Sequence, residues 1–394
     1  MTRRNVLLSL CTGALLFNTG RTLASPAARP RLLVIFLRGG YDSASVLVPV
    51  ASPFYYEARP DIAIAKPSPA PESAVAIDDQ WGLHPALRNT VYPLFLRGEA
   101  AFIPFAGTND TSRSHFETQE AIELGLADDR VRNARSGFLN RLAATLTGTE
   151  PMAFTDNLPI ILQGPVQVAN ASLRNPAKPS VDGRQSHLIE SMYRGTGLED
   201  KVVEGFALRE QIAREMAAEM QAASGSAITA KGFELEARRM ARLMGESHDI
   251  GFVDVGGWDT HVNQGAGTGY LASRLEELGR GLAAYAHEMD SAWRSTLVVV
   301  LSEFGRTFRQ NGNRGTDHGH GTTFWVLGGS LRGGRVAGDQ VRVSASTLFQ
   351  NRDLPVLNEY RQLLAGLFAR QFGLDRDRLA QVFPGVSPLD LNLL

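Results

Sequence analysis

The chain has 394 residues, of which 43% are hydrophobic and 21% charged, a composition that fits a globular protein and excludes a disordered or collagen-like one. Forty basic and 41 acidic side chains give a net charge of -1, which leaves no basic excess for binding nucleic acid or an anionic membrane surface. The single cysteine, Cys11, excludes an internal disulfide and a metal site built from thiolates. A metal ion would therefore need His, Asp and Glu ligands.

The N-terminus has the features of an export signal. Arg3 and Arg4 precede a short apolar run that ends at Phe17, and small residues lie close to Ala24. This pattern is typical of a twin-arginine signal peptide. Because the run is shorter than the roughly 20 residues that cross a bilayer, we expect residues 1–24 to be removed and the mature chain to have no stable membrane span. The sequence thus predicts a periplasmic or secreted protein that uses the twin-arginine export machinery.

Short apolar runs alternate with segments of helical periodicity over residues 30–394. The first run, Leu32 to Leu37, is uninterrupted and stops at two glycines, which is typical of a strand buried on both faces of a parallel sheet. We expect further strands at 101–105, 158–162, 250–255, 296–301 and 324–327, and helices at 85–96, 116–124, 270–293 and 356–372. The alternation predicts an α/β fold with a doubly wound, mostly parallel sheet flanked by helices. Residues 186–246 carry no strand signal and are expected to form a helical insertion.

Polar side chains follow several of the expected strands, where a sheet of this kind binds its ligands. The candidate metal ligands are the carboxylates and imidazoles in these positions: Asp42, Asp259, His261, Glu303, Asp317, His318 and His320. Oxygen and imidazole ligands without thiolate suit zinc, manganese, iron(II) or magnesium. The sequence therefore predicts a divalent metal site and leaves the identity of the metal open.

A further polar segment lies at the start of the helix expected near residue 116. Backbone N–H groups at a helix N-terminus favour anions, so the hydroxyl of Ser112 or Ser114 could attack a phosphoryl or sulfuryl centre while Arg113 stabilises its oxygens. The alternative is an ordinary capping box, because Ser114 and Glu117 have its spacing. His115 is a candidate metal ligand or acid-base group.

The motifs FLRGGYD, SRSHFETQE, GGWDTH, SEFGRT and TDHGHG occur in this order after the signal. The chain resembles the exported bacterial family known as domain of unknown function 1501 and, more remotely, the alkaline phosphatase and sulfatase superfamily. This resemblance implies an alkaline phosphatase-like core with a one-metal or two-metal site. Carried over by motif, it implies that Asp42 is the first-strand carboxylate and that Ser112 or Ser114 is the nucleophile. It also implies that Asp259 and His261 form the loop pair and that His318 or His320 is the final histidine.

The resemblance is incomplete at one strand end. Where the superfamily has Asp-His, this chain has Glu303 and Phe304, so one imidazole is missing unless the loop of Asp317 and His318 supplies it.

Two functions are therefore open. The first is an exported metal-dependent hydrolase acting on a phosphate or sulfate ester, in which Arg38, Arg113 or Arg306 holds the small anionic substrate. The alternative is a non-catalytic exported protein that binds a metal or a ligand at a degenerate hydrolase site. A nucleotide-binding module is disfavoured because the glycines at 265–269 lack the required spacing, and a metal-free serine hydrolase because no Gly-x-Ser-x-Gly elbow is present.

Overall fold

The computed structural model describes residues 29–126, 135–173, 183–207 and 232–394. The expected signal peptide, residues 1–24, lies outside these ranges. Among the helices described, none combines the length and the apolar content that a membrane span requires.

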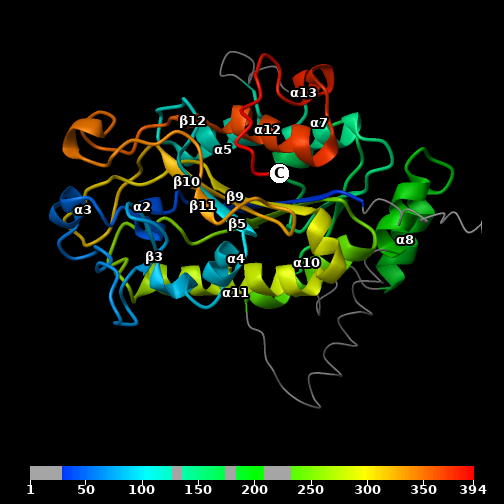
Figure 1. Cartoon of the computed structure of the whole chain (residues 1–394). Helices are drawn as coiled ribbons and strands as arrows, with labels where there is room; N and C mark the ends of the chain where they lie inside the picture. The colour runs from blue at the N-terminus through cyan, green and yellow to red at the C-terminus, as the bar shows by residue number, and fades with distance from the viewer. Residues whose placement is uncertain (1–28, 127–134, 174–182, 208–231) are drawn as a thin grey trace, which may run out of the picture.

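The centre of the described fold is a nine-stranded sheet (Figure 1). Its order is β11-β5-β10-β9-β1-β8-β6-β7, with β12 paired to β5. The strands are β1 (Arg31–Leu37), β5 (Ala100–Gly107), β6 (Pro151–Ala153), β7 (Ala169–Asn170), β8 (Ile250–Val255), β9 (Thr296–Ser302), β10 (Thr322–Leu327), β11 (Arg335–Val336) and β12 (Asn358–Glu359). β1 is parallel to β8 and β9, whereas β10 is antiparallel to β5 and β9. The predicted mostly parallel sheet flanked by helices is confirmed.

Helices cover both faces of the sheet (Figure 1). One face carries α4 (Val91–Leu96), α10 (Phe233–Glu246) and α11 (Tyr270–Glu288), and the other α5 (His115–Leu124), α7 (Phe138–Thr145), α12 (Tyr360–Phe372) and α13 (Arg376–Val382). Leu33 and Ile35 of β1 belong to the core on the first face, and Leu32 and Val34 to the core on the second. Because successive side chains of a strand point to opposite faces, a strand between two helical layers must be apolar throughout.

The remaining elements are short. A second sheet has the order β2-β4-β3. The smaller elements are β2 (Leu47–Val48), β3 (Val75–Ala76), β4 (Gly82–Leu83), α2 (Ser43–Val46), α3 (Pro53–Ala58), α8 (Gly183–Tyr193) and the 3-10 helices η1 (Pro85–Leu87), η2 (Ile160–Leu162), η3 (Asp290–Ser295) and η4 (Ala345–Thr347).

Three expected elements differ in the structure. The strand expected at 158–162 is instead the 3-10 helix η2, whose Ile161 and Leu162 are fully buried. The apolar run reflects the burial of these residues. Periodicity alone does not show whether such a short buried run is a strand or a helix. The helix expected at 85–96 is divided into η1 and α4, and the helix expected at 270–293 ends at Glu288 before η3.

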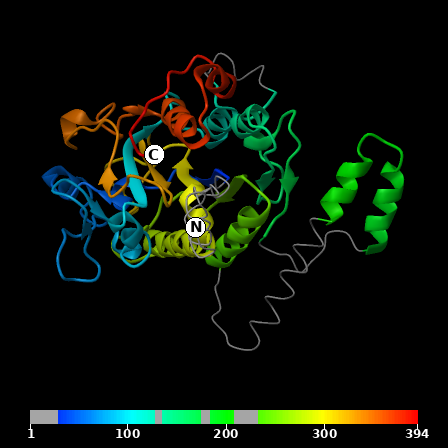
Figure 2. The same cartoon turned by 45° about the vertical axis from the view of Figure 1, so that its right-hand side comes forward.

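Most of the described part of residues 186–246 is helical. α8 exposes Leu188 and Met192, and Figure 2 shows it standing apart from the sheet. α10 instead packs on α11 and buries Met240 and Met244. The segment expected to be one insertion therefore contains both a projecting helix and a helix of the core layer.

Candidate metal centre

The segments after several strands meet at one edge of the sheet. His115 begins α5, which follows β5 in the chain. Asp259 and His261 follow β8, and Glu303 follows β9. His318 precedes β10, which runs in the opposite direction and so begins at the same edge. The sheet thus brings together side chains that are up to 203 residues apart in the chain.

Four of these side chains form what we call the histidine cluster: His115, Asp259, His261 and His318. The Nε2 atom of His318 lies 3.0 Å from Nε2 of His115 and 3.2 Å from Nε2 of His261. Asp259 Oδ1 lies 2.9 Å from His261 Nε2 and 3.2 Å from His318 Nε2, and Asp259 Oδ2 lies 3.5 Å from His115 Nε2. One atom each of His115, Asp259 and His318 lie within 4.8 Å of one another, a spacing that could hold a metal ion.

Each imidazole of the histidine cluster is anchored through its other nitrogen, Nδ1. The three contacts are His115 to Glu303 Oε1 at 2.7 Å, His261 to Asp317 Oδ1 at 3.1 Å, and His318 to the carbonyl oxygen of Arg113 at 3.1 Å. All three partners only accept hydrogen bonds, so this network assigns the proton to Nδ1 and the lone pair to Nε2. A histidine that binds a metal almost always donates its other N–H in this way.

The charges around the histidine cluster suit a divalent cation. Asp259 belongs to the cluster, and the carboxylates of Glu303 and Asp317 bond its imidazoles. Burial opposes ionisation of all three carboxylates, but hydrogen bonds hold the pKa of each below its usual value. The partners are Arg306 for Asp259, His115 and Gln119 for Glu303, and Asn311 and His261 for Asp317. Three carboxylates (Asp259, Glu303 and Asp317) and the guanidinium of Arg306 together carry an excess of two negative charges. A cation of charge +2 would balance them.

The contact between His115 and His318 requires something between the two nitrogens. Two lone pairs at 3.0 Å repel, so either a proton or a cation must bridge them. The hydrogen bond with Glu303 raises the pKa of His115, whereas burial, together with the charge of His115, lowers the pKa of His318. A proton held by this pair therefore sits on His115, and a bound metal would displace it.

Two glycines allow the loops to approach this closely. Gly39 has a φ of +122°, and a Cβ there would lie 2.7 Å from the backbone nitrogen of Asp259. The Gly39 N–H also donates to Glu303 Oε1 at 2.8 Å. A Cβ at Gly319 would overlap the backbone of Arg306, where the chain forms a β-bridge to His318.

Four predicted metal ligands are not members of the histidine cluster. Asp42 is 1% exposed and accepts hydrogen bonds from Nη1 and Nη2 of Arg59 at 2.5 and 2.9 Å, so the structure places it in a buried ion pair. His320 is buried, and its ring centroid lies 4.8 Å from that of Phe349. The structure thus places it as a packed side chain. Glu303 and Asp317 bond Nδ1 atoms of the cluster.

The two candidate nucleophiles make local hydrogen bonds. Ser112 Oγ donates to Asp110 Oδ2 at 2.9 Å. Ser114 is the N-cap of α5, and its Oγ accepts from the Glu117 N–H at 3.5 Å. Within the part of the chain that the structure describes, neither hydroxyl contacts the histidine cluster. The capping alternative thus describes Ser114, whereas His115 of the same segment lies in the cluster.

The arginines expected to hold an anion are all engaged in ion pairs. Arg38 Nη1 lies 2.7 Å from Glu123, and Arg113 Nη2 lies 2.7 Å from the buried carboxylate of Asp353. Arg306, whose side chain is fully buried, pairs with Asp259. Its contact is therefore with a member of the cluster, and its role in holding substrate stays a prediction.

Sequence reasoning missed several groups that support the cluster. Gln119 Nε2 donates to Glu303 Oε1 at 2.8 Å, and Asn311 Nδ2 donates to Asp317 Oδ1 at 3.1 Å. Gln119 could have been found, because it lies four residues after His115 on the same helical face. The carbonyl of Arg113 carries no sequence signal, because every residue has one.

Removing the charge of Glu303 is expected to weaken metal binding. Glu303→Gln keeps the size of the side chain but loses the carboxylate that holds His115 Nδ1. We expect a loss of about 10–100-fold in Zn²⁺ affinity, the usual effect of changing the partner of a ligating histidine. Competition titration with a chromophoric chelator measures it. Glu99→Gln, in the surface pair with Arg97, is the control, and equal affinities of the two variants would contradict the prediction.

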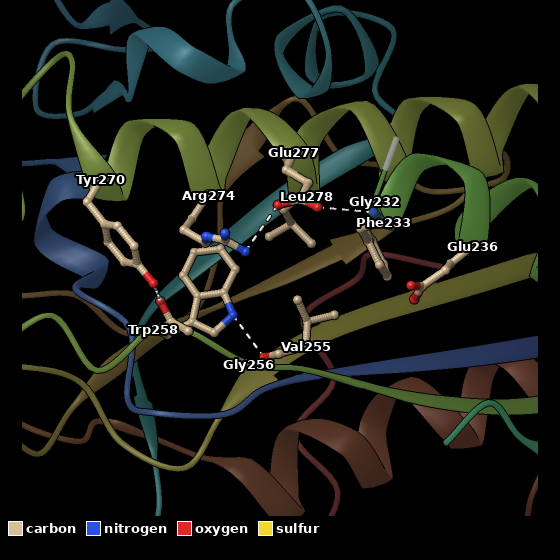
Figure 3. A pocket seen from close by; sticks show the side chains of 11 residues that line it. Gly232, Phe233, Glu236, Val255, Gly256, Trp258, Tyr270, Arg274, Glu277 and Leu278 are labelled. Carbon is tan, nitrogen blue, oxygen red and sulfur yellow. Dashed lines mark hydrogen bonds and ion pairs between the residues drawn. The ribbon is translucent and has the colours of Figure 1, made fainter. Parts of the chain in front are cut away.

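A cavity of about 350 Å³ borders the loop that carries Asp259 (Figure 3). It lies between α10, α11 and the residues after β8, and the wall includes Trp258, the residue before Asp259. On this wall Tyr270 donates to the Gly257 carbonyl at 3.2 Å, and Arg274 Nη1 lies 3.2 Å from Glu277.

The fold and the cluster together define a class: a mostly parallel α/β protein with a candidate metal centre at the carboxyl edge of its sheet. The chain belongs to the family described as "Protein of unknown function (DUF1501)", which matches residues 29–383. No curated protein sequence matches it.

Solved structures show a remote similarity. A protein of the alkaline phosphatase superfamily from Vibrio parahaemolyticus shares 11% identity and a TM-score of 0.38, over 94% of this chain and 75% of that one. Ps i-CgsB in complex with k-i-k-neocarrahexaose shares 8% identity and a TM-score of 0.39, over 92% of this chain and 75% of that one. The C-terminal periplasmic domain of EcEptC from Escherichia coli in complex with zinc shares 10% identity and a TM-score of 0.33, over 76% of this chain and 73% of that one. Similarity this remote assigns no residue roles in the present chain.

Proposed function

We propose that this protein is an exported hydrolase that uses a divalent cation to cleave a phosphate or sulfate ester. The observation that carries the proposal is the histidine cluster, in which three anchored imidazoles direct Nε2 toward one carboxylate. A cation bound there would supply Lewis-acid chemistry, polarising an ester oxygen and making water more acidic.

The donor set fits a transition metal better than magnesium or calcium. His115, His261 and His318 offer nitrogen, and Asp259 offers the single carboxylate among the four side chains. Imidazole suits zinc, iron and similar ions, whereas magnesium and calcium prefer oxygen ligands throughout. We therefore propose zinc as the first metal to test.

The chain's own residues would orient the substrate at this edge of the sheet. α5 begins at His115, and the backbone N–H groups of its first turn favour an anion. Phe304 packs against the rings of His115 and His318, at centroid distances of 4.9 and 5.2 Å, and so keeps water from that side of the cluster.

The test is metal content followed by turnover. We expect protein purified after export to contain a divalent metal, and to hydrolyse an aryl phosphate or an aryl sulfate in a reaction that chelator stops and zinc or manganese restores. Folded protein that is metal-free and gains no activity from either ion would overturn the proposal.

The second candidate is a non-catalytic metal-binding or ligand-binding protein. The observation in its favour is that Ser112 and Ser114 bond within their own segment and not to the cluster. Stoichiometric metal without turnover across a broad ester panel would support this candidate.

Export through the twin-arginine route is the second part of the proposal. We expect the mature protein in the periplasm or medium to begin at Ser25, as measured by N-terminal sequencing. Replacing Arg3 and Arg4 by lysine should retain the chain in the cytoplasm, whereas unchanged export would refute the route.

A further inference from the structure

We infer that Gln264 and Thr316 are positioning residues that act through Arg306 to fix the carboxylate of Asp259. The inference rests on the proposed function in one respect, which is that the histidine cluster holds a cation. Neither residue is a metal ligand, and both lie behind the cluster in the interior of the protein.

Four buried side chains connect the interior to the cluster, and we call them the buried relay: Asp42, Gln264, Thr316 and Arg306. Gln264 Nε2 donates to Asp42 Oδ2 at 2.7 Å, and Thr316 Oγ1 donates to Gln264 Oε1 at 3.2 Å. Arg306 Nε donates to Thr316 Oγ1 at 3.1 Å, and Arg306 Nη1 donates to Asp259 Oδ1. Each relay residue is at most 2% exposed, so water cannot replace a lost partner.

The buried ion pair sets the direction of every bond in the relay. Burial alone would raise the pKa of Asp42, but the charge and hydrogen bonds of Arg59 outweigh it and hold that pKa below its usual value. Asp42 therefore only accepts, which turns the amide nitrogen of Gln264 toward it and the amide oxygen toward Thr316. The hydroxyl of Thr260 also donates to this oxygen, at 3.0 Å. A flipped amide would place its oxygen against the Asp42 carboxylate and lose that bond.

Thr316 fixes Arg306 because its hydroxyl has only one proton. That proton goes to Gln264, so the oxygen remains free to accept from Arg306 Nε. The Thr316 carbonyl accepts from Arg306 Nη2 as well. With Nε and Nη2 both held by one residue, the planar guanidinium has its Nη1 aimed at Asp259.

Asp259 needs such a partner because its carboxylate is partly open to solvent. Its side chain is 42% exposed, although the preceding Trp258 is fully buried. A carboxylate in that setting would otherwise sample several rotamers, and ordering it would reduce the free energy gained on binding a cation.

The test compares Thr316→Val, which removes the hydroxyl at nearly constant shape, with Thr316→Ser, which restores it. We expect Thr316→Val to bind Zn²⁺ about 10–100-fold more weakly, and the visible spectrum of its Co²⁺ form to change, while Thr316→Ser behaves like wild type. Thr296→Val is the matched control, because it removes a buried threonine hydroxyl that donates to the Ala292 carbonyl and contacts no member of the relay. Wild-type affinity and spectrum in Thr316→Val would overturn the inference.

A second readout does not depend on metal. In arginine-labelled, metal-free protein we expect the Arg306 Nε–H to exchange with water at least tenfold faster in Thr316→Val than in wild type or Thr316→Ser; equal rates would refute the relay. Should Thr316→Val not fold, Gln264→Met carries the same expectations. Wild-type protein that binds no Zn²⁺ would refute the proposed function, and the exchange rates would still decide the relay.

Discussion

Replacing His318 with alanine is expected to abolish high-affinity metal binding. His318 Nε2 is the atom that approaches both other imidazoles and Asp259 Oδ1. Since changing a partner that only supports a ligating histidine costs about 10–100-fold, losing this central ligand should cost more than about 100-fold. Isothermal titration with Zn²⁺ measures the loss, and far-UV circular dichroism checks that the fold is retained.

His320→Ala is the matched control for this prediction. His320 is a histidine of the same loop, two residues away, but its ring packs on Phe349. We expect its loss to lower stability through packing and to leave Zn²⁺ affinity unchanged. Equal losses of affinity in the two variants would show that the cluster does not hold the metal.

Asp42→Asn is expected to be the most destabilising conservative change near the site. Arg59 is fully buried, and the substitution removes the charge that balances it. Breaking a buried ion pair from one side costs about 3–5 kcal/mol, because the remaining charge is left uncompensated. Urea unfolding at neutral pH measures the effect. Asp390→Asn, in an exposed pair with Arg370, should leave the midpoint unchanged.

The pH dependence of this pair tests the same interaction. Arg59 holds the pKa of Asp42 below its unfolded value, which is about 3.9 for an aspartate. The stabilisation is therefore complete above that pH and is lost as the pH falls through the folded-state pKa. We expect the difference between wild type and Asp42→Asn to stay constant from pH 7 to 5 and to shrink below about pH 4. A difference that shrinks above pH 5 would contradict this assignment.

The sequence was most informative where burial and chemistry coincide. The apolar run of β1 predicts a strand between two helical layers because both of its faces are buried. Asp259, His261 and His318 could be found because polar residues directly after a buried strand, or before one that begins at the same edge, lie where the sheet exposes its ligands.

The sequence was least informative about which polar side chain meets which. Asp42 follows β1 as a ligand would, yet Arg59, seventeen residues later, turns it inward. Glu303 lies where the superfamily resemblance expects an aspartate. A glutamate is one methylene longer, and its carboxylate contacts His115 Nδ1. Hydrogen-bond partners across 188 residues depend on how the loops pack, which neither periodicity nor spacing records.

The order of the strands has a consequence for how a cation would bind. β5 and β8, which deliver His115 and Asp259, are separated in the sheet by β10, β9 and β1. No fragment that lacks the middle strands can bring these ligands together, so a cation would favour only the finished sheet and would stabilise it by mass action. The site for the ion would exist only once the five strands from β5 to β8 are paired.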